Sequence, residues 1–140
     1  MEITSNAVQT VSVNQDVLFT ETAVAGNSSI LHREGSGLVT LRGLSSCQSR
    51  ARFRVSFGAN IAIPADGAVA PISLALSIDG EPINTTTMIY TPTATATYGN
   101  VFGAIFIDIP RGCCGRVSVT NTSAAAINVQ NANLIVERVA

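Results

Sequence analysis

Lysine and tryptophan are absent from this chain, and charged residues make up only 12% of it. All eight basic residues are arginine. Without lysine the chain cannot form a P-loop or a Schiff base. The formal net charge of −1 provides no basic field to hold nucleic acid or an anionic membrane. These absences predict no nucleic-acid partner and exclude two large classes of enzyme.

Long apolar runs are also missing. The longest largely apolar stretch, residues 101–110, is interrupted by Asp108 and is too short to span a bilayer, so we expect no membrane insertion. The first residues, MEITSNAVQTVSV, contain neither the basic region nor the apolar core of a secretory signal. We therefore expect the chain to be made in the cytoplasm of its cell without classical export.

The residues that are present favour strands. Val, Ile and Thr together number 41, and Ser and Asn add 13 and 10 more, which is a composition typical of β-structure with a hydroxyl- and amide-rich surface. A length of 140 residues suits one domain, so we assign residues 1–140 to a single domain.

Apolar and polar residues alternate along much of the chain, which indicates strands with one buried face. In ARFRVSFGANIAIP, Phe53 and Val55 alternate with Arg52 and Arg54. Residues 72–78 alternate in the same way and end at Asp79-Gly80, a hairpin-turn dipeptide. Further candidate strands are residues 8–13, 17–22, 29–33, 38–42, 86–91, 101–110, 116–121 and 126–139. About ten short strands separated by turns predict an all-β sandwich or barrel.

The last candidate strand contains an irregularity. Its apolar positions change parity between Val129 and Ala132. A β-bulge inserts one extra residue and produces such a change, so we expect a bulge near Gln130 and Asn131.

One strand is apolar on both faces. In VFGAIFIDIP the odd positions, beginning at Val101, form a β-branched core face. The even positions are Phe102, Ala104, Phe106 and Asp108. A strand with two apolar faces is normally covered twice, and in a protein of this size the second cover is another subunit. We therefore predict that these four even-numbered residues form an interface between copies of the chain.

Three segments resemble the tumour-necrosis-factor-like jelly rolls, a superfamily that includes complement globular heads. They are VLFTETAVAGNSSILHREGSGLVTLRG (17–43), RFRVSFGANIAIP (52–64) and FIDIPRGCCGRVSVTNTSAAAINVQNANLIVERVA (106–140). The sequence also resembles short Firmicutes prophage proteins and the C-terminal domains of exosporium collagen-like proteins. The resemblance implies an antiparallel β-sandwich with jelly-roll topology, whose final strand is central. It further implies a homotrimer around a threefold axis, with no enzymatic activity and no cofactor.

The three cysteines do not suit a metal site. A structural zinc takes four ligands, usually two spaced pairs, and the chain has three Cys and one His. Cys113 and Cys114 are adjacent, so on a strand their side chains would point to opposite faces. We interpret Cys47, Cys113 and Cys114 as structural thiols, with one of the adjacent pair packed inward as a small apolar group. A single bond from Cys47 to Cys113 or Cys114 remains open, and so does a strained Cys113–Cys114 bond.

The remaining polar candidates are His32 and two arginines. No nucleophile and carboxylate pair accompanies His32 in the sequence, so we interpret it as a surface or cap residue. Arg52 and Arg54 share the polar face of one strand. They are either a charged solvated or intersubunit face, which we favour, or a pair that holds a carboxylate or sulfated sugar.

Together these features predict a non-enzymatic, homotrimeric virion component, either a capsid decoration protein or a fibre head of a bacteriophage. Its place would be the virion surface, and its partners would be itself and phage capsid or tail proteins. The alternative is an adhesin on a bacterial cell or spore surface that binds a glycan.

Overall fold

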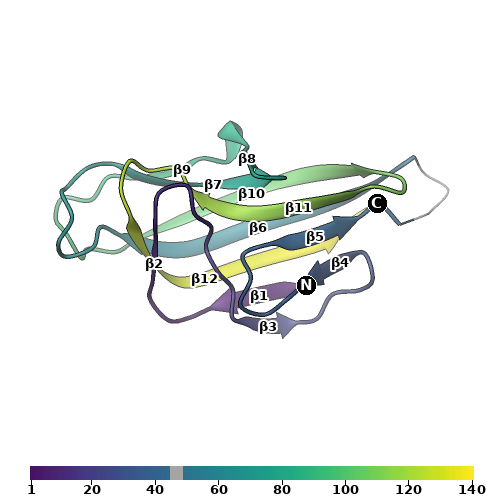
Figure 1. The fold of residues 1–140 in the computed structure, drawn as a ribbon, viewed down its shortest axis with the longest axis horizontal. Coiled ribbons are helices and arrows are strands. Elements are labelled where there is room, and N and C mark those ends of the chain that lie inside the picture. Colours follow the sequence, from purple (N-terminus) through teal and green to yellow (C-terminus); the bar gives the residue numbers. More distant parts are fainter. Residues whose placement is uncertain (45–48) are drawn as a thin grey trace.

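The computed structural model describes residues 1–44 and 49–140, and it consists of two antiparallel sheets packed face to face (Figure 1). In strand order, sheet A contains β10 (Gly99–Pro110), β6 (Arg50–Ala62), β12 (Ile127–Arg138), β1 (Glu2–Ser5) and β3 (Glu21–Val24), and β2 (Gln9–Val11) pairs with β12. Sheet B contains β4 (Ile30–His32), β5 (Val39–Arg42), β11 (Cys114–Asn121), β7 (Ile72–Ile78) and β8 (Glu81–Pro82), and β9 (Met88–Tyr90) pairs with β7. A 3-10 turn, η1 (Asn84–Thr86), precedes β9. The predicted all-β sandwich is confirmed.

The core lies between the two sheets and follows from the alternation in the sequence. On β6 the odd positions from Ala51 to Ile61 are buried, and the even positions face outward or are half-buried. Phe57 meets Phe19 edge to face, with their ring centroids 6.2 Å apart. Burial of these apolar side chains is the main driving force that joins the sheets. None of the helical structure among the described residues is long and apolar enough to cross a membrane.

β12 lies at the centre of sheet A, as the resemblance implies. It pairs with β6 on one side, and with β1 and β2 on the other. Its register with β6 shifts between Gln130 and Asn133, and Asn131 adopts a left-handed conformation with φ of 55°. This is the bulge that the change of apolar parity predicts. Asparagine tolerates the left-handed region better than most residues do.

The hairpin between β7 and β8 also agrees with its sequence. Asp79 and Gly80 have φ values of 50° and 84°, so both central residues of the turn are left-handed. Two-residue hairpin turns of this kind match the right-handed twist of the strands that they join. Asp79 also accepts a hydrogen bond from the backbone N–H of Arg116, at 3.0 Å, which ties the turn to β11.

Two features of the N-terminal region differ from the prediction. The four residues of β1 form a central strand that the sequence pattern does not indicate. Residues 17–20 are not a strand, although Val17 and Phe19 are fully buried. Their backbone N–H groups instead bond to the carbonyls of Val119 and Ser36, in sheet B and its hairpin loop. This segment crosses from one sheet to the other. Its apolar residues alternate because every second side chain is buried, although its backbone forms no continuous ladder of hydrogen bonds with one strand.

Candidate interaction face

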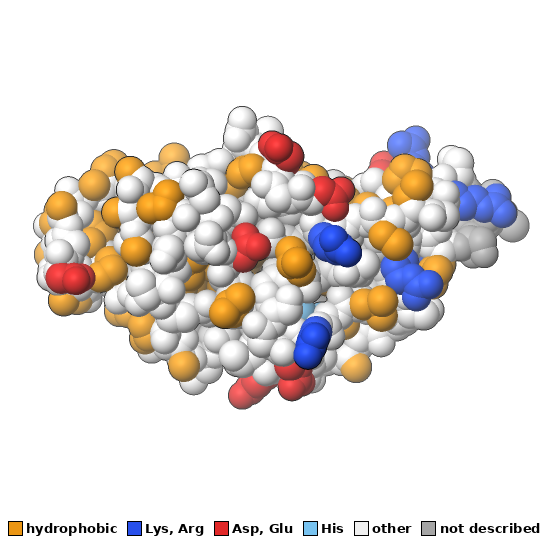
Figure 2. Space-filling model, in the orientation of Figure 1, with side chains coloured by type: hydrophobic (Ala, Val, Ile, Leu, Met, Phe, Trp, Pro, Cys, Tyr) orange, Lys and Arg blue, Asp and Glu red, His pale blue; other side chains and the backbone are white. Residues whose placement is uncertain are grey.

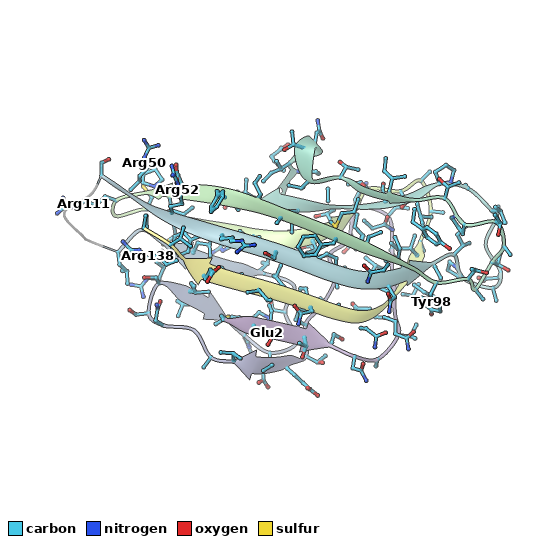
Figure 3. All side chains as sticks on the ribbon, turned by 180° about the vertical axis from the view of Figure 1, so that it is seen from behind. Glu2, Arg50, Arg52, Tyr98, Arg111 and Arg138 are labelled. Atoms are coloured by element: carbon cyan, nitrogen blue, oxygen red, sulfur yellow. The ribbon has the colours of Figure 1, made fainter. Side chains whose placement is uncertain are left out.

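The outer face of sheet A brings together the residues that the sequence predicts at a subunit interface. β10 pairs with β6 along its whole length, so its side chains alternate between the core and the outside. Those on the outside are Phe102, Ala104, Phe106 and Asp108. β10 is also the edge strand of sheet A, with no partner on its far side among the described residues. Figure 3 views the molecule from this side.

The two phenylalanine rings on β10 are open to solvent in the single chain. Phe102 is 65% exposed and Phe106 is 62% exposed. Phe102 lies opposite Gly58, and a methyl group on that glycine would be 3.7 Å from ring carbon Cδ2. The ring therefore lies over the glycine and covers a backbone position that has no side chain of its own. Aromatic residues often cover strand glycines in this way.

The apolar surface continues around the rings. Phe106 borders a shallow hollow of about 270 Å³ that Arg54, Ala104 and Ile105 also line. Ala104 lies opposite Ser56 on β6, and Ser56 lies opposite Ile135 on β12, whose side chain is exposed. Apolar side chains are thus exposed on β10 and on β12, with Ser56 of β6 between them.

Ion pairs occupy one end of this face. Arg52 donates two hydrogen bonds to Asp108, at 2.8 Å from Nε and 3.0 Å from Nη2, and Arg50 lies 3.3 Å from the same carboxylate. Arg54 and Glu137 form a looser pair at 3.7 Å. The hydrogen bonds from Arg52 hold the pKa of the Asp108 carboxyl below its ordinary value, against an opposing effect of partial desolvation. Asp108 in turn raises the pKa of Arg52.

These pairings bear on the two roles predicted for Arg52 and Arg54. Each guanidinium already has an acidic partner on a neighbouring strand. An external carboxylate or sulfate would have to displace that partner. The geometry therefore favours a charged face over an anion grip at these two residues.

A row of asparagines lies at the other end of the face. Asn100 donates to Asn60 at 3.1 Å, Asn60 donates to Asn131 at 3.0 Å, and Asn131 donates to Asn6 at 2.6 Å. The row crosses β10, β6 and β12 and reaches the segment after β1. Asn60 and Asn131 each keep a second N–H that can bind a partner, whereas Asn100 also donates to the carbonyl of Ala59, at 3.3 Å. This row is not apparent in the sequence, because its members are at least 31 positions apart and only the fold brings them together. Asparagine is uncommon in strands, so its repeated presence at outward positions is the one signal that could have indicated the row.

The complete face has an apolar centre between two polar ends. In Figure 3 the labelled Arg50 and Arg52 lie at one end of sheet A, and Tyr98 lies near the other. Protein interfaces commonly have an aromatic centre with a polar rim that fixes orientation. The arrangement is suited to contact with another protein surface.

The cysteines are placed differently from the prediction. Cys113 and Cys114 are both exposed, and neither forms a disulfide with another described residue. The expectation that one of them packs inward is wrong. Cys113 lies in the turn between β10 and β11, where Gly112 has a φ of 80°. Cys114 is the first residue of β11 and lies at an exposed position, next to the buried Gly115. Cys47 lies outside the described residues.

His32 has a structural position. Its Nε2 atom lies 2.9 Å from the carbonyl oxygen of Ser36, to which it donates a hydrogen bond. Its ring meets Phe19 edge to face at 6.4 Å between centroids. Among residues 1–44 and 49–140, no group of three or more His, Cys, Asp or Glu side chains could hold a metal ion.

Solved structures share this fold. The globular domain of zebrafish complement 1qA protein matches with a TM-score of 0.61 and 12% identity, over 96% of this chain and 93% of that chain. Murine APRIL at pH 5.0 matches with a TM-score of 0.57 and 10% identity, over 92% and 97%. At pH 8.5 it matches with a TM-score of 0.54 and 10% identity, over 91% and 95%. No protein-family model and no curated protein matches the chain. The jelly-roll topology expected from the resemblance is confirmed, whereas the similarity to prophage and exosporium proteins stays a prediction.

Proposed function

We propose that this chain is a non-enzymatic structural protein that assembles as a homotrimer through the outer face of sheet A. The observation that carries the proposal is the exposure of Phe102 and Phe106 on one face of an edge strand. Soluble monomers rarely leave a contiguous apolar patch of this kind uncovered. A second copy that covers β10 would bury both rings.

The edge position of β10 supports the same proposal. A strand of 12 residues whose far side has no partner in the described chain is a template for unwanted pairing. Proteins protect such edges with charges, with prolines or with a covering element. Within β10 itself, Asp108 and Pro110 near its end are the residues of this kind, and β9 and η1 pack against its first half without pairing with it. A neighbouring subunit is therefore the natural cover for the rest of the edge.

Threefold symmetry is proposed from the fold resemblance. In a closed trimer, one surface of each subunit packs against a different surface of the next, and the ring closes without leaving a free interface. The ion pairs of Arg52 and Arg54 at one end, and the asparagine row at the other, would fix the orientation of each contact.

We further propose that the trimer is a bacteriophage virion component, either a capsid decoration protein or a fibre head, located at the virion surface. This role is supported by the small size of the jelly roll, by the low content of charged residues and by the resemblance of the sequence of residues 106–140 to prophage proteins. The partners would be capsid or tail proteins. Genes for such proteins beside this one would support the role, and spore-coat or cell-wall genes in their place would contradict it.

A second candidate is a surface adhesin that binds a glycan. The observation that favours it is the asparagine row beside Phe102, where amides could bond to sugar hydroxyls and a ring could cover an apolar sugar face. The two functions differ in a simple measurement. Self-association should protect from hydrogen exchange those β10 amides that do not bond to β6, in the pure protein, whereas a glycan site should leave these amides unprotected until sugar is added.

A further inference from the structure

The outer face of sheet B contains a hollow that is separate from the interaction face. Leu31, Thr40 and Arg116 lie side by side on β4, β5 and β11, because Thr40 pairs with each of the other two. Adjacent strands are about 4.8 Å apart, so this row is about 10 Å wide. The hollow has a volume of about 450 Å³ and also includes His32, Arg33, Ser36 and Leu38. No acidic residue lines it.

Two arginines border this hollow without acidic partners. Within residues 1–44 and 49–140, salt bridges involve Arg50, Arg52 and Arg54, and none involves Arg33 or Arg116. Both residues are exposed. A guanidinium that makes no internal ion pair keeps its planar fork of donors for an external oxyanion.

The loop that carries Arg33 is held in place. The backbone N–H of Ser36 bonds to the carbonyl of Arg33 at 3.0 Å, and the ring of His32 bonds to the carbonyl of Ser36 at 2.9 Å. Gly35 adopts a φ of 91° and donates its N–H to the carbonyl of Phe19 at 2.8 Å. These bonds fix the loop to the core, so one wall of the hollow is preformed. Preformed sites bind with a smaller loss of conformational entropy.

The hollow also presents apolar surface. Leu31 is 46% exposed and Leu38 is 42% exposed, and both lie beside the arginines. Figure 2 shows arginine and apolar side chains close together on this side of the molecule. We infer that the hollow binds a small ligand that joins an oxyanion, either a carboxylate or a sulfate ester, to an aliphatic body. Arg33 and Arg116 bind the oxyanion, and Leu31 and Leu38 contact the body.

The site does not depend on the proposed function. Figures 1 and 2 view sheet B, and Figure 3 views sheet A from the opposite side of the sandwich. A monomer leaves the hollow open to solvent, and so does a trimer whose two contact surfaces both lie outside the outer face of sheet B. The two proposals can therefore fail separately.

The test is a nuclear magnetic resonance titration of the ¹⁵N-labelled full chain with hexanoate and with hexyl sulfate. Hexanol supplies the body without the charge, and inorganic sulfate supplies the charge without the body. A six-carbon probe is small, so we expect a Kd on the order of 1–10 mM for at least one of the two anions. The amides that shift should be those of residues 31–40 and of Arg116. The anion that binds more tightly identifies the head group.

Three variants separate the site from general charge effects. Arg33→Gln and Arg116→Gln should each weaken binding about tenfold, the usual effect of losing a charge-assisted hydrogen bond. Arg111→Gln, on the exposed turn after β10, removes the same charge elsewhere and should leave the Kd unchanged. Leu38→Ser should weaken the binding of each six-carbon anion that the wild type binds, and it should leave the binding of inorganic sulfate unchanged.

Each other outcome overturns the inference. It is wrong if neither anion binds, or if the shifts map to the outer face of sheet A. It is also wrong if hexanol binds as tightly as the anions, because the arginines then contribute nothing. If Arg111→Gln weakens binding as much as Arg33→Gln does, the effect comes from net charge and not from this site. If inorganic sulfate binds as tightly as hexyl sulfate, the leucines contribute nothing to binding.

Discussion

Replacing Phe106 by aspartate puts a carboxylate where the outer face of β10 presents an apolar ring. The ring is 62% exposed in the single chain. A phenylalanine buries roughly 200 Å² when fully covered, so a partner subunit would remove about 120 Å² more from water. At about 25 cal/mol per Å², this area contributes about 3 kcal/mol per chain to association. That loss alone raises the dissociation constant of each contact by roughly two orders of magnitude. The cost of burying a charge adds to it.

The variant should remain folded while it loses assembly. Phe106 lies on the outer face and not in the buried core, so its removal should change the circular dichroism spectrum and the midpoint of thermal unfolding little. Sedimentation velocity over a range of protein concentrations measures the assembly directly. Phe102→Asp should behave in the same way, because its ring is exposed to the same extent on the same face.

A matched control is available on another surface. Val69 lies in the loop between β6 and β7 and is 53% exposed, so Val69→Asp also replaces an exposed apolar side chain by a carboxylate. This variant should assemble like the wild type. If Phe106→Asp assembles with unchanged affinity, or if Val69→Asp dissociates equally, the assignment of the interface to β10 is refuted.

Three further results are expected. Arg52 lowers the pKa of Asp108 in the folded protein. The ionised carboxylate therefore stabilises the fold at any pH above 3.8, its pKa in the unfolded chain, and this stabilisation is lost as the pH falls through the lower pKa of the folded protein. Thermal melts should therefore show Asp108→Asn to be less stable than wild type at neutral pH and equal to it in strong acid. Asn131→Ala should destabilise the protein in urea by about 1 kcal/mol more than Asn131→Gly, because alanine resists the left-handed bulge conformation. Cys113→Ser and Cys114→Ser should each change the free energy of unfolding by less than about 0.5 kcal/mol, and both native thiols should react rapidly with a disulfide reagent.

Opposite results would identify specific errors. A difference between wild type and Asp108→Asn that persists unchanged into strong acid would mean that the carboxylate is not the cause of the effect. Equal stability of the alanine and glycine variants at Asn131 would argue that the bulge relaxes. A thiol that resists the reagent would show that the turn after β10 is covered.

Most of the fold can be predicted from the alternation of apolar and polar residues along the sequence. Alternation on β6 and β10 is a direct consequence of the two-residue repeat of a strand, and it identified both faces of β10. The parity change in β12 located the bulge for the same reason. β1 was not predictable in this way, because four residues are too few to establish a period and its pairing with β12 joins the two ends of the chain.

The candidate sites depend on pairings between distant segments, and this is why the sequence revealed only part of them. Phe102 and Phe106 were found because they lie on one strand. The asparagine row and the pair Arg33 and Arg116 come from separate strands, and only the strand order makes them neighbours. The prediction of an inward cysteine is wrong because Cys113 lies in the turn and the first inward position of β11 is Gly115, not Cys114.

We propose that copies of this chain cover the outer face of sheet A for one another. The most direct test of this proposal is the mass of the wild-type protein in solution, measured by native mass spectrometry and checked by equilibrium sedimentation. We expect an assembly of three chains of 14.5 kDa each. A protein that remains a single chain at every concentration, with both rings left in water, would contradict it.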